Sequence, residues 1–106
     1  MITSDDLFRI LGDPTRRALF ERLTREGELT VGALTREAGV SQPAVSKHLA
    51  ALKGAGLVVD RPEGRQTHYS ANPQALAPLA DWMSAQGVFW NRKLDALEDL
   101  LKRMDQ

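Results

Sequence analysis

The feature that most constrains this chain of 106 residues is a long apolar stripe in its last third. The stripe consists of Leu76, Leu79, Met83, Gln86, Trp90, Leu94, Leu97, Leu101 and Met104, and Trp82, Phe89 and Leu100 widen it. Steps of three and four residues over so long a stretch predict an amphipathic helix. The remaining residues form a head too small to cover this seam, so we expect two chains to lay these helices side by side.

Two alternatives remain open for this helix. Trp82, Phe89 and Trp90 could line a small-molecule pocket, although packing across a seam between two chains explains them more simply. Gly87 lies within the predicted helix and is a candidate position for a kink.

Glycine and proline divide the first part of the chain into two predicted helices. Ser4 is the expected cap of a helix over residues 4–11, which ends at Gly12. Asp13 precedes Pro14 and predicts a second helix over residues 14–26, closed by Gly27. We expect this helix to bury Ala18, Leu19, Phe20 and Leu23 and to turn Arg16, Arg17, Arg22 and Arg25 outward.

Two more helices follow, separated by a short turn. Thr30 is the expected cap of a helix over residues 31–38, which Gly39 ends. Ser41 caps the next helix and must bond the amide of Ala44, because Pro43 has no N–H. Helical spacing points Val45, Leu49 and Leu52 inward, which leaves Gln42, Ser46, Lys47 and Lys53 for the opposite face.

From residue 57 onward, the spacing of apolar residues changes from that of a helix to that of β-strands. Residues 57–61 and 66–70 are predicted strands, joined by a Pro-Glu-Gly-Arg turn in a β-hairpin. Asn72 and Pro73 start a helical turn, and Pro78 starts the long helix. The fold class is therefore mainly α with a small β-hairpin, and this order of elements is that of a winged helix-turn-helix.

At this point the sequence resembles the ArsR-type bacterial transcriptional regulators, in a cysteine-free branch. The resemblance is carried by residues 11–17 (LGDPTRR), residues 40–49 (VSQPAVSKHL), and residues 63–65 (EGR) followed by Tyr69. The chain length predicts a single domain over residues 1–106, in which the resemblance covers a DNA-binding head over 4–71 and is followed by a terminal helix over 73–104. The resemblance also implies a homodimeric repressor whose first helix (4–11) and last helix form the interface. The expected interface residues are Leu7, Phe8, Leu11, Met83, Trp90, Leu94, Leu97 and Leu101.

A helix that projects from the protein surface fits the major groove of DNA, where its first residues contact base edges. We therefore expect double-stranded DNA to contact Ser41, Gln42, Pro43, Ser46, Lys47, His48, Arg61 and Arg65. Glutamine can bond adenine bidentately, lysine offers a charge to phosphate or guanine, and an arginine beside the turn of the wing can reach a phosphate. Each has a plainer interpretation as a solvated polar residue, and His48 could instead bond a carbonyl at the rim of the core. His68 is expected to be exposed.

The sequence also argues against several functions. Without cysteine there is no disulfide, thiolate metal site or thiol nucleophile. In the family that this sequence resembles, one metal site uses two cysteines at the start of the third helix, and these positions are Thr30 and Gly32 here. Another site uses aspartate and histidine on the terminal helix, and no histidine follows His68. We therefore expect no metal sensing at either site, and no cofactor. Residue spacing suggests no catalytic constellation, so an enzyme is not expected. No apolar run is long enough for a membrane span and no signal-peptide pattern begins the chain, so a cytoplasmic location is expected.

The balance of charges leaves one alternative function open. Fourteen basic residues match fourteen acidic residues, which favours no general affinity for polyanions. A winged-helix module that binds another protein, with no specific DNA binding, is therefore the alternative to a repressor. No small-molecule effector is assigned from the sequence.

Overall fold

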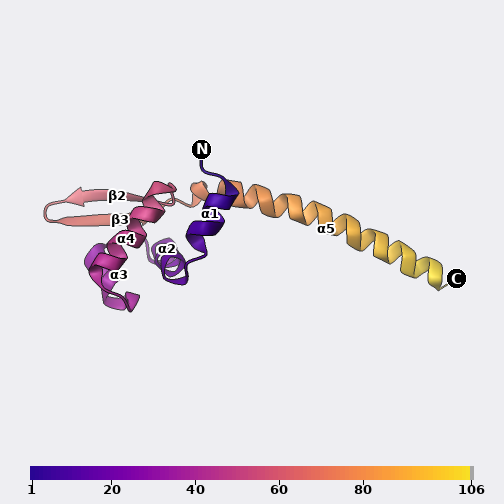
Figure 1. The fold of residues 1–106 in the computed structure, drawn as a ribbon, viewed down its shortest axis with the longest axis horizontal. Coiled ribbons are helices and arrows are strands. Elements are labelled where there is room, and N and C mark those ends of the chain that lie inside the picture. The colour runs from indigo at the N-terminus through magenta and orange to yellow at the C-terminus, as the bar shows by residue number, and fades with distance from the viewer. Residues whose placement is uncertain (106) are drawn as a thin grey trace.

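The structure, a computed structural model, describes residues 1–105. Its elements are α1 (Ser4–Leu11), α2 (Pro14–Glu26), β1 (Leu29–Thr30), α3 (Val31–Ala38), α4 (Gln42–Gly54), β2 (Val58–Glu63), β3 (Gln66–Ala71), a 3₁₀ turn (Pro73–Leu76) and α5 (Ala77–Met104). Figure 1 shows α1 to β3 gathered in one head, from which α5 projects as a single rod. The molecule is accordingly elongated, 73 × 29 × 21 Å along its principal axes.

The core of the head lies where α1, α2, α3 and α4 meet the base of the hairpin. Its buried side chains are Leu7, Leu19, Phe20, Leu23, Leu34, Val45, Leu49, Leu52, Ala55, Leu57 and Val58. Burying each of the larger ones contributes roughly 1.5–3 kcal/mol relative to leaving it exposed. The predicted inward residues of α2 and α4 are confirmed except Ala18, which is exposed and lines a surface hollow between α2 and α3.

The N-terminal cap of α1 differs from the prediction. Ser4 is the first helical residue, and Thr3 is the cap. The hydroxyl of Thr3 accepts from the amide of Asp6 at 3.3 Å, and the carboxylate of Asp6 accepts from the amide of Thr3 at 2.9 Å. This capping box satisfies two backbone donors at once, which explains why the helix begins after Thr3.

The sheet has three strands in the order β1-β3-β2, so β3 lies in the middle. The predicted hairpin is confirmed, with strands slightly longer than expected, and only Gly64 and Arg65 form the turn. Pro62 lies inside β2, which it can do because β2 is an edge strand. The sequence analysis missed β1, whose two residues pair with Tyr69 and His68 but are too few to show a strand period.

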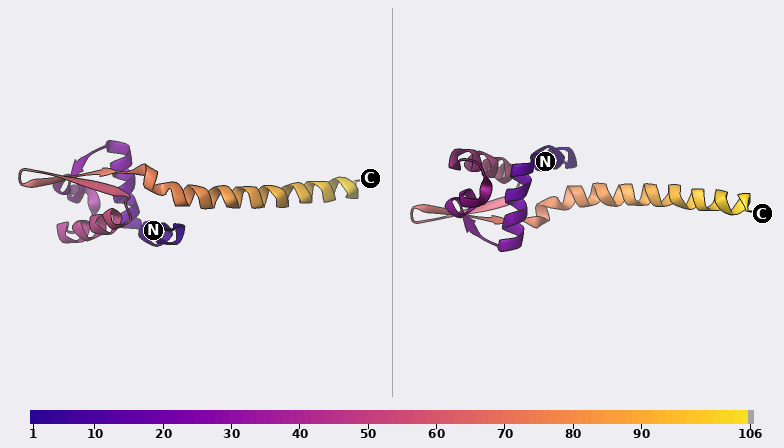
Figure 2. Two further views of the ribbon diagram at one scale, coloured as in Figure 1. Left: turned by 90° about the horizontal axis from the view of Figure 1, so that it is seen from above. Right: turned by 90° about the horizontal axis from the view of Figure 1, so that it is seen from below.

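The terminal helix α5 runs without interruption through Gly87. Leu76 and Leu79 pack against the core of the head, and none of the side chains from Ala77 to Met104 is buried. Both views in Figure 2 show the rest of α5 extending away from the head. The apolar stripe predicted from the sequence is therefore open along the length of the rod.

Candidate nucleic-acid interface

Two hydroxyl caps and one glycine set the ends of α3 and the start of α4. The hydroxyl of Thr30 accepts from the amide of Ala33 at 3.1 Å, and that of Ser41 accepts from the amide of Ala44 at 3.3 Å. Gly39 ends α3 with φ of +73°, a conformation that L side chains rarely adopt. Leu34 and Val45 are fully buried and hold the two helices together. The caps predicted from the sequence at Thr30 and Ser41 are confirmed, and the buried face of α4 packs it against the head.

The outer face of α4 carries the expected polar residues. Ser41, Gln42, Pro43, Ser46 and Lys47 are all exposed, on the side opposite the buried residues of the same helix. Lys53, farther along, is held by Asp60, since its Nζ lies 2.9 Å from Oδ2 of that residue. The hydrogen bond that Lys53 donates to this carboxylate raises the pKa of Lys53 above its usual value. The first turns of α4 therefore present a polar surface with Lys47 as its cation.

His48 is turned partly inward. Its Nδ1 is buried and finds no hydrogen-bond partner among residues 1–105. The pKa of Asp13 is lowered mainly by the hydrogen bond from the amide of Arg16, and also by the charge of His48. His48 thus lies between the polar face of α4 and the start of α2.

The wing and the start of α4 converge on one hollow of about 320 Å³. It is lined by Thr30, Val31, Gly32, Gln42, Arg65, Gln66 and Thr67. Gly64 opens the turn of the wing with φ of +60°, as the primed turns of hairpins require, and Arg65 follows it in an exposed position. The structure therefore brings together two of the expected site residues, Gln42 and Arg65.

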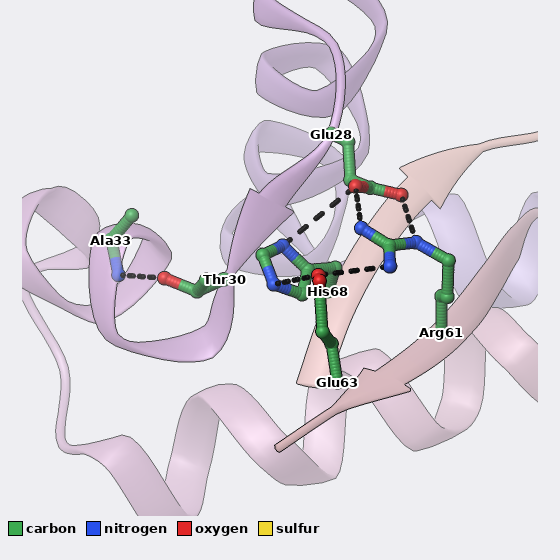
Figure 3. Close-up of polar contacts among 6 residues, drawn as sticks. All are labelled: Glu28, Thr30, Ala33, Arg61, Glu63 and His68. Atoms are coloured by element: carbon green, nitrogen blue, oxygen red, sulfur yellow. Dashed lines mark hydrogen bonds and ion pairs between the residues drawn. The ribbon is translucent and has the colours of Figure 1, made fainter. Parts of the chain in front are cut away.

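Arg61 lies elsewhere on the wing, in a cluster of charged side chains (Figure 3). Its Nη2 is 2.6 Å from Oε1 of Glu28 and its Nε is 3.3 Å from Oε2, which makes the pair bidentate. Its Nη1 is 2.9 Å from Oε2 of Glu63. The guanidinium expected to contact DNA is thus engaged by two carboxylates of its own chain. These bonds lower the pKa of Glu28 and raise that of Arg61.

The same cluster corrects the expectation for His68. Its side chain is only 22% exposed and lies between the two glutamates. Its Nδ1 is 3.7 Å from Glu28 and its Nε2 is 3.5 Å from Glu63. Alternation along the strand could not reveal this, because the carboxylate of Glu28 arrives from a distant part of the chain.

Arg22 was expected to face outward and instead supports the helix-turn-helix. Its side chain is 15% exposed, and its Nη1 donates to the carbonyl oxygens of Ala33 and Leu34 at 3.0 and 3.3 Å. Glu26 and Glu37 flank the same guanidinium. Arg22 therefore joins α2 to the middle of α3. Sequence reasoning missed it because an arginine on an amphipathic helix usually lies in water.

The residues expected at the interface between two chains differ in how exposed they are. Phe8, Met83, Trp90, Leu94, Leu97 and Leu101 are exposed, and Leu11 is half-buried. Leu7 differs from the expectation: it is fully buried in the core of the head, so its side chain has no surface to offer to a second chain.

The structure also bears on metal and membrane binding. Within residues 1–105 there is no group of three or more His, Cys, Asp or Glu side chains arranged to hold a metal ion. Over the same part of the chain, no helix has the length and apolar content needed to span a bilayer. Thr30 and Gly32 lie at the start of α3, where Thr30 serves as the helix cap.

Comparison with known proteins places these features among regulators of transcription. A family model described as a helix-turn-helix domain matches residues 11–61. The chain is 44% identical over 97 residues to the HTH-type transcriptional regulator Rv2034 of Mycobacterium tuberculosis, covering 92% of this chain and 87% of that protein. It is 33% identical to the transcriptional repressor SdpR of Bacillus subtilis, covering 74% of this chain and 87% of that protein.

Solved structures show the same fold. An ArsR-like transcriptional regulator from Rhodococcus sp. RHA1 is 31% identical, with a TM-score of 0.73 over 91% of this chain and 90% of that one. The homodimeric winged helix-turn-helix DNA-binding domain Mb0332 from Mycobacterium bovis, a possible ArsR-family regulator, is 26% identical, with a TM-score of 0.62 over 78% of this chain and 76% of that one.

Proposed function

The chain belongs to the ArsR family of DNA-binding winged helix-turn-helix transcriptional regulators, which are not enzymes, and we propose that it is a homodimeric repressor of a roughly palindromic operator. The observation that carries this proposal is the exposed polar face at the start of α4. The opposite face of the same helix is buried in the core, so the polar face points outward from the head. A helix so presented fits the major groove of B-form DNA.

Each expected contact residue except Arg61, which is engaged by Glu28 and Glu63, has a role in this proposal. Gln42 reads a base edge, with adenine as the favoured partner, and Lys47 binds phosphate or guanine. Ser41, Pro43, Ser46 and His48 line the same face of α4 or its rim. Arg65 reaches a phosphate or a narrow minor groove from the wing, on the far side of the hollow that it shares with Gln42.

The apolar stripe of α5 supplies the second half of the proposal. Trp90, Leu94, Leu97 and Leu101 are each at least half exposed in the single chain. Covering them with a second copy removes this apolar surface from water and relates the two α4 helices by a twofold axis. Two such helices about 34 Å apart meet successive turns of DNA, and occupancy near a promoter then excludes polymerase.

We further propose that the protein does not sense soft metals by the family's usual route. The chain has no cysteine, and hydroxyl and glycine at residues 30 and 32 are poor ligands for such ions. The place of action is the cytoplasm, where bacterial DNA is found.

The decisive experiment is the selection of bound duplexes from a random DNA pool at two salt concentrations. We expect a motif with two related half-sites about one helical turn apart, and affinity that falls as salt rises. A pool that yields no enriched motif at either salt concentration would overturn the proposal and favour a protein-binding module instead.

A further inference from the structure

We propose that Arg61 and Glu28 form a clamp that sets the position of the wing against the helix-turn-helix, so that Arg61 is a positioning residue and not a phosphate contact. This inference rests on the proposed DNA binding. The clamp is defined by the bidentate pair of Arg61 with Glu28, together with Glu63 and His68 on either side (Figure 3).

The position of Glu28 in the fold gives the clamp its effect. Glu28 precedes β1, and β1 leads directly into α3, the first helix of the helix-turn-helix. Arg61 lies on β2, which is separated from β1 by the central strand β3. The ion pair therefore bridges the width of the sheet and joins its far edge to the corner where α3 begins. His68 of β3 pairs across the sheet with both Thr30 and Arg61 and lies beneath this bridge.

Local charge argues against a phosphate contact at Arg61. Its Nε and Nη2 donate to Glu28 and its Nη1 to Glu63, so a phosphate would have to displace carboxylates that are already in place. A phosphate that approaches Arg61 also meets the carboxylates of Glu28 and Glu63, and these like charges repel it. Arg65, in contrast, lies exposed at the turn and lines the hollow beside α4.

The clamp also needs the shape of arginine. A bidentate pair uses the planar fork of the guanidinium, which lysine lacks although it carries the same charge. A phosphate contact, by comparison, depends mainly on charge and survives replacement by lysine in large part. The two roles of Arg61 therefore predict different outcomes for the same substitution.

The test uses the full chain and the duplex with the highest affinity from the random-pool selection. Arg61→Ala, Arg61→Lys and Glu28→Gln should each weaken binding about threefold to tenfold, with the slope of log affinity against log salt unchanged. Arg65→Ala is the matched control, because it removes an arginine from the same wing and should lower that slope by about one. Far-UV circular dichroism and thermal unfolding check that each variant is folded.

Hydrogen exchange of the free protein supplies a readout that needs no DNA. Backbone amides of residues 29–30, 61 and 63–68 should exchange faster in Glu28→Gln and Arg61→Lys than in the wild type, and those of α4 should not. Unchanged exchange in the wing would overturn the clamp. So would a fall of about one in the salt slope for Arg61→Ala, or tighter binding by Glu28→Gln, since freeing a phosphate-binding arginine strengthens the complex.

The two proposals fail in different ways. If the wild type selects no duplex, the proposed function is wrong, and the exchange data alone support or overturn the clamp. If the wild type binds DNA and Arg61→Ala behaves like Arg65→Ala, the function stands and the clamp is wrong.

Discussion

The ring of Phe8 lies edge-on against the ring of Trp82, with centroids 5.0 Å apart and planes at 81°. This contact packs α1 against the first turns of α5 and so contributes to the direction in which α5 extends from the head. Both rings remain nearly half exposed. They therefore extend the apolar stripe of α5 onto the head, and a second chain would cover the pair together with the stripe.

A charge placed in the stripe should separate the two chains. Leu97→Glu puts a carboxylate in the middle of the exposed apolar face of α5, where pairing would bury it without a partner. We expect the variant to sediment as a single chain at concentrations at which the wild type is a dimer, and to lose affinity for a two-half-site duplex.

Ser84→Glu is the control for this experiment. Ser84 is an exposed residue on the opposite side of the same helix, so its variant adds the same charge outside the seam. The proposed interface is wrong if Leu97→Glu remains dimeric, or if both variants dissociate alike.

Gln42 and Lys47 should differ in what they contribute to DNA binding. Gln42→Ala should cost about 1–3 kcal/mol and relax the preference at one base position, because a bidentate contact to a base is lost. Lys47→Ala should weaken binding to all sequences and lower the salt slope by about one. Repeating the selection with each variant, and measuring affinity against salt, checks both. An unchanged motif would remove Gln42 from the base contacts, and an unchanged slope would remove Lys47 from the phosphate contacts.

Substitution of two glycines by alanine should have different effects on the free energy of unfolding. Gly39 has φ of +73°, so Gly39→Ala should lower the free energy of unfolding by about 1–2 kcal/mol, although there is open space around its Cα. Gly54 is the last helical residue of α4 and is equally unobstructed, so Gly54→Ala should be neutral or raise stability by up to about 0.5–1 kcal/mol. Urea unfolding at one protein concentration measures both. Equal effects of the two substitutions would contradict the conformational argument.

Acid should weaken the head in part through Asp13. The amide of Arg16 donates to its carboxylate at 2.9 Å, and this bond lowers the pKa of Asp13 below its usual value of 3.8. A lowered folded pKa means that the stabilisation is present above the unfolded pKa and is lost as the pH falls through the folded pKa.

Asp13→Asn keeps a capping oxygen but removes this titration. We expect the melting temperature of the variant to fall less than that of the wild type as the pH is lowered from about 6 to about 3. Asp6 and Glu28 also have lowered pKa values and should leave a residual fall in the variant. Parallel curves for the two proteins would show that Asp13 does not contribute.

Much of the site could be predicted because it is local in sequence. The caps at Thr30 and Ser41, the glycine at residue 39 and the two faces of α4 each follow from a few neighbouring residues. The convergence of Gln42 with Arg65 could be anticipated only in outline, because it depends on how the hairpin is laid against α3 and α4.

The sequence by itself determined the order of the helices and the wing hairpin, the buried face of α4 and the uncovered stripe of α5, because periodicity, caps and glycines act over one or two helical turns. Only the tertiary structure decided that Arg61 meets Glu28, that His68 is enclosed between two glutamates, and that Arg22 bonds the backbone of α3. It likewise decided that Leu29 and Thr30 join the sheet. The physical reason is that each of these contacts joins residues distant along the chain, and a charged side chain carries no local signal of the partner that folding brings to it.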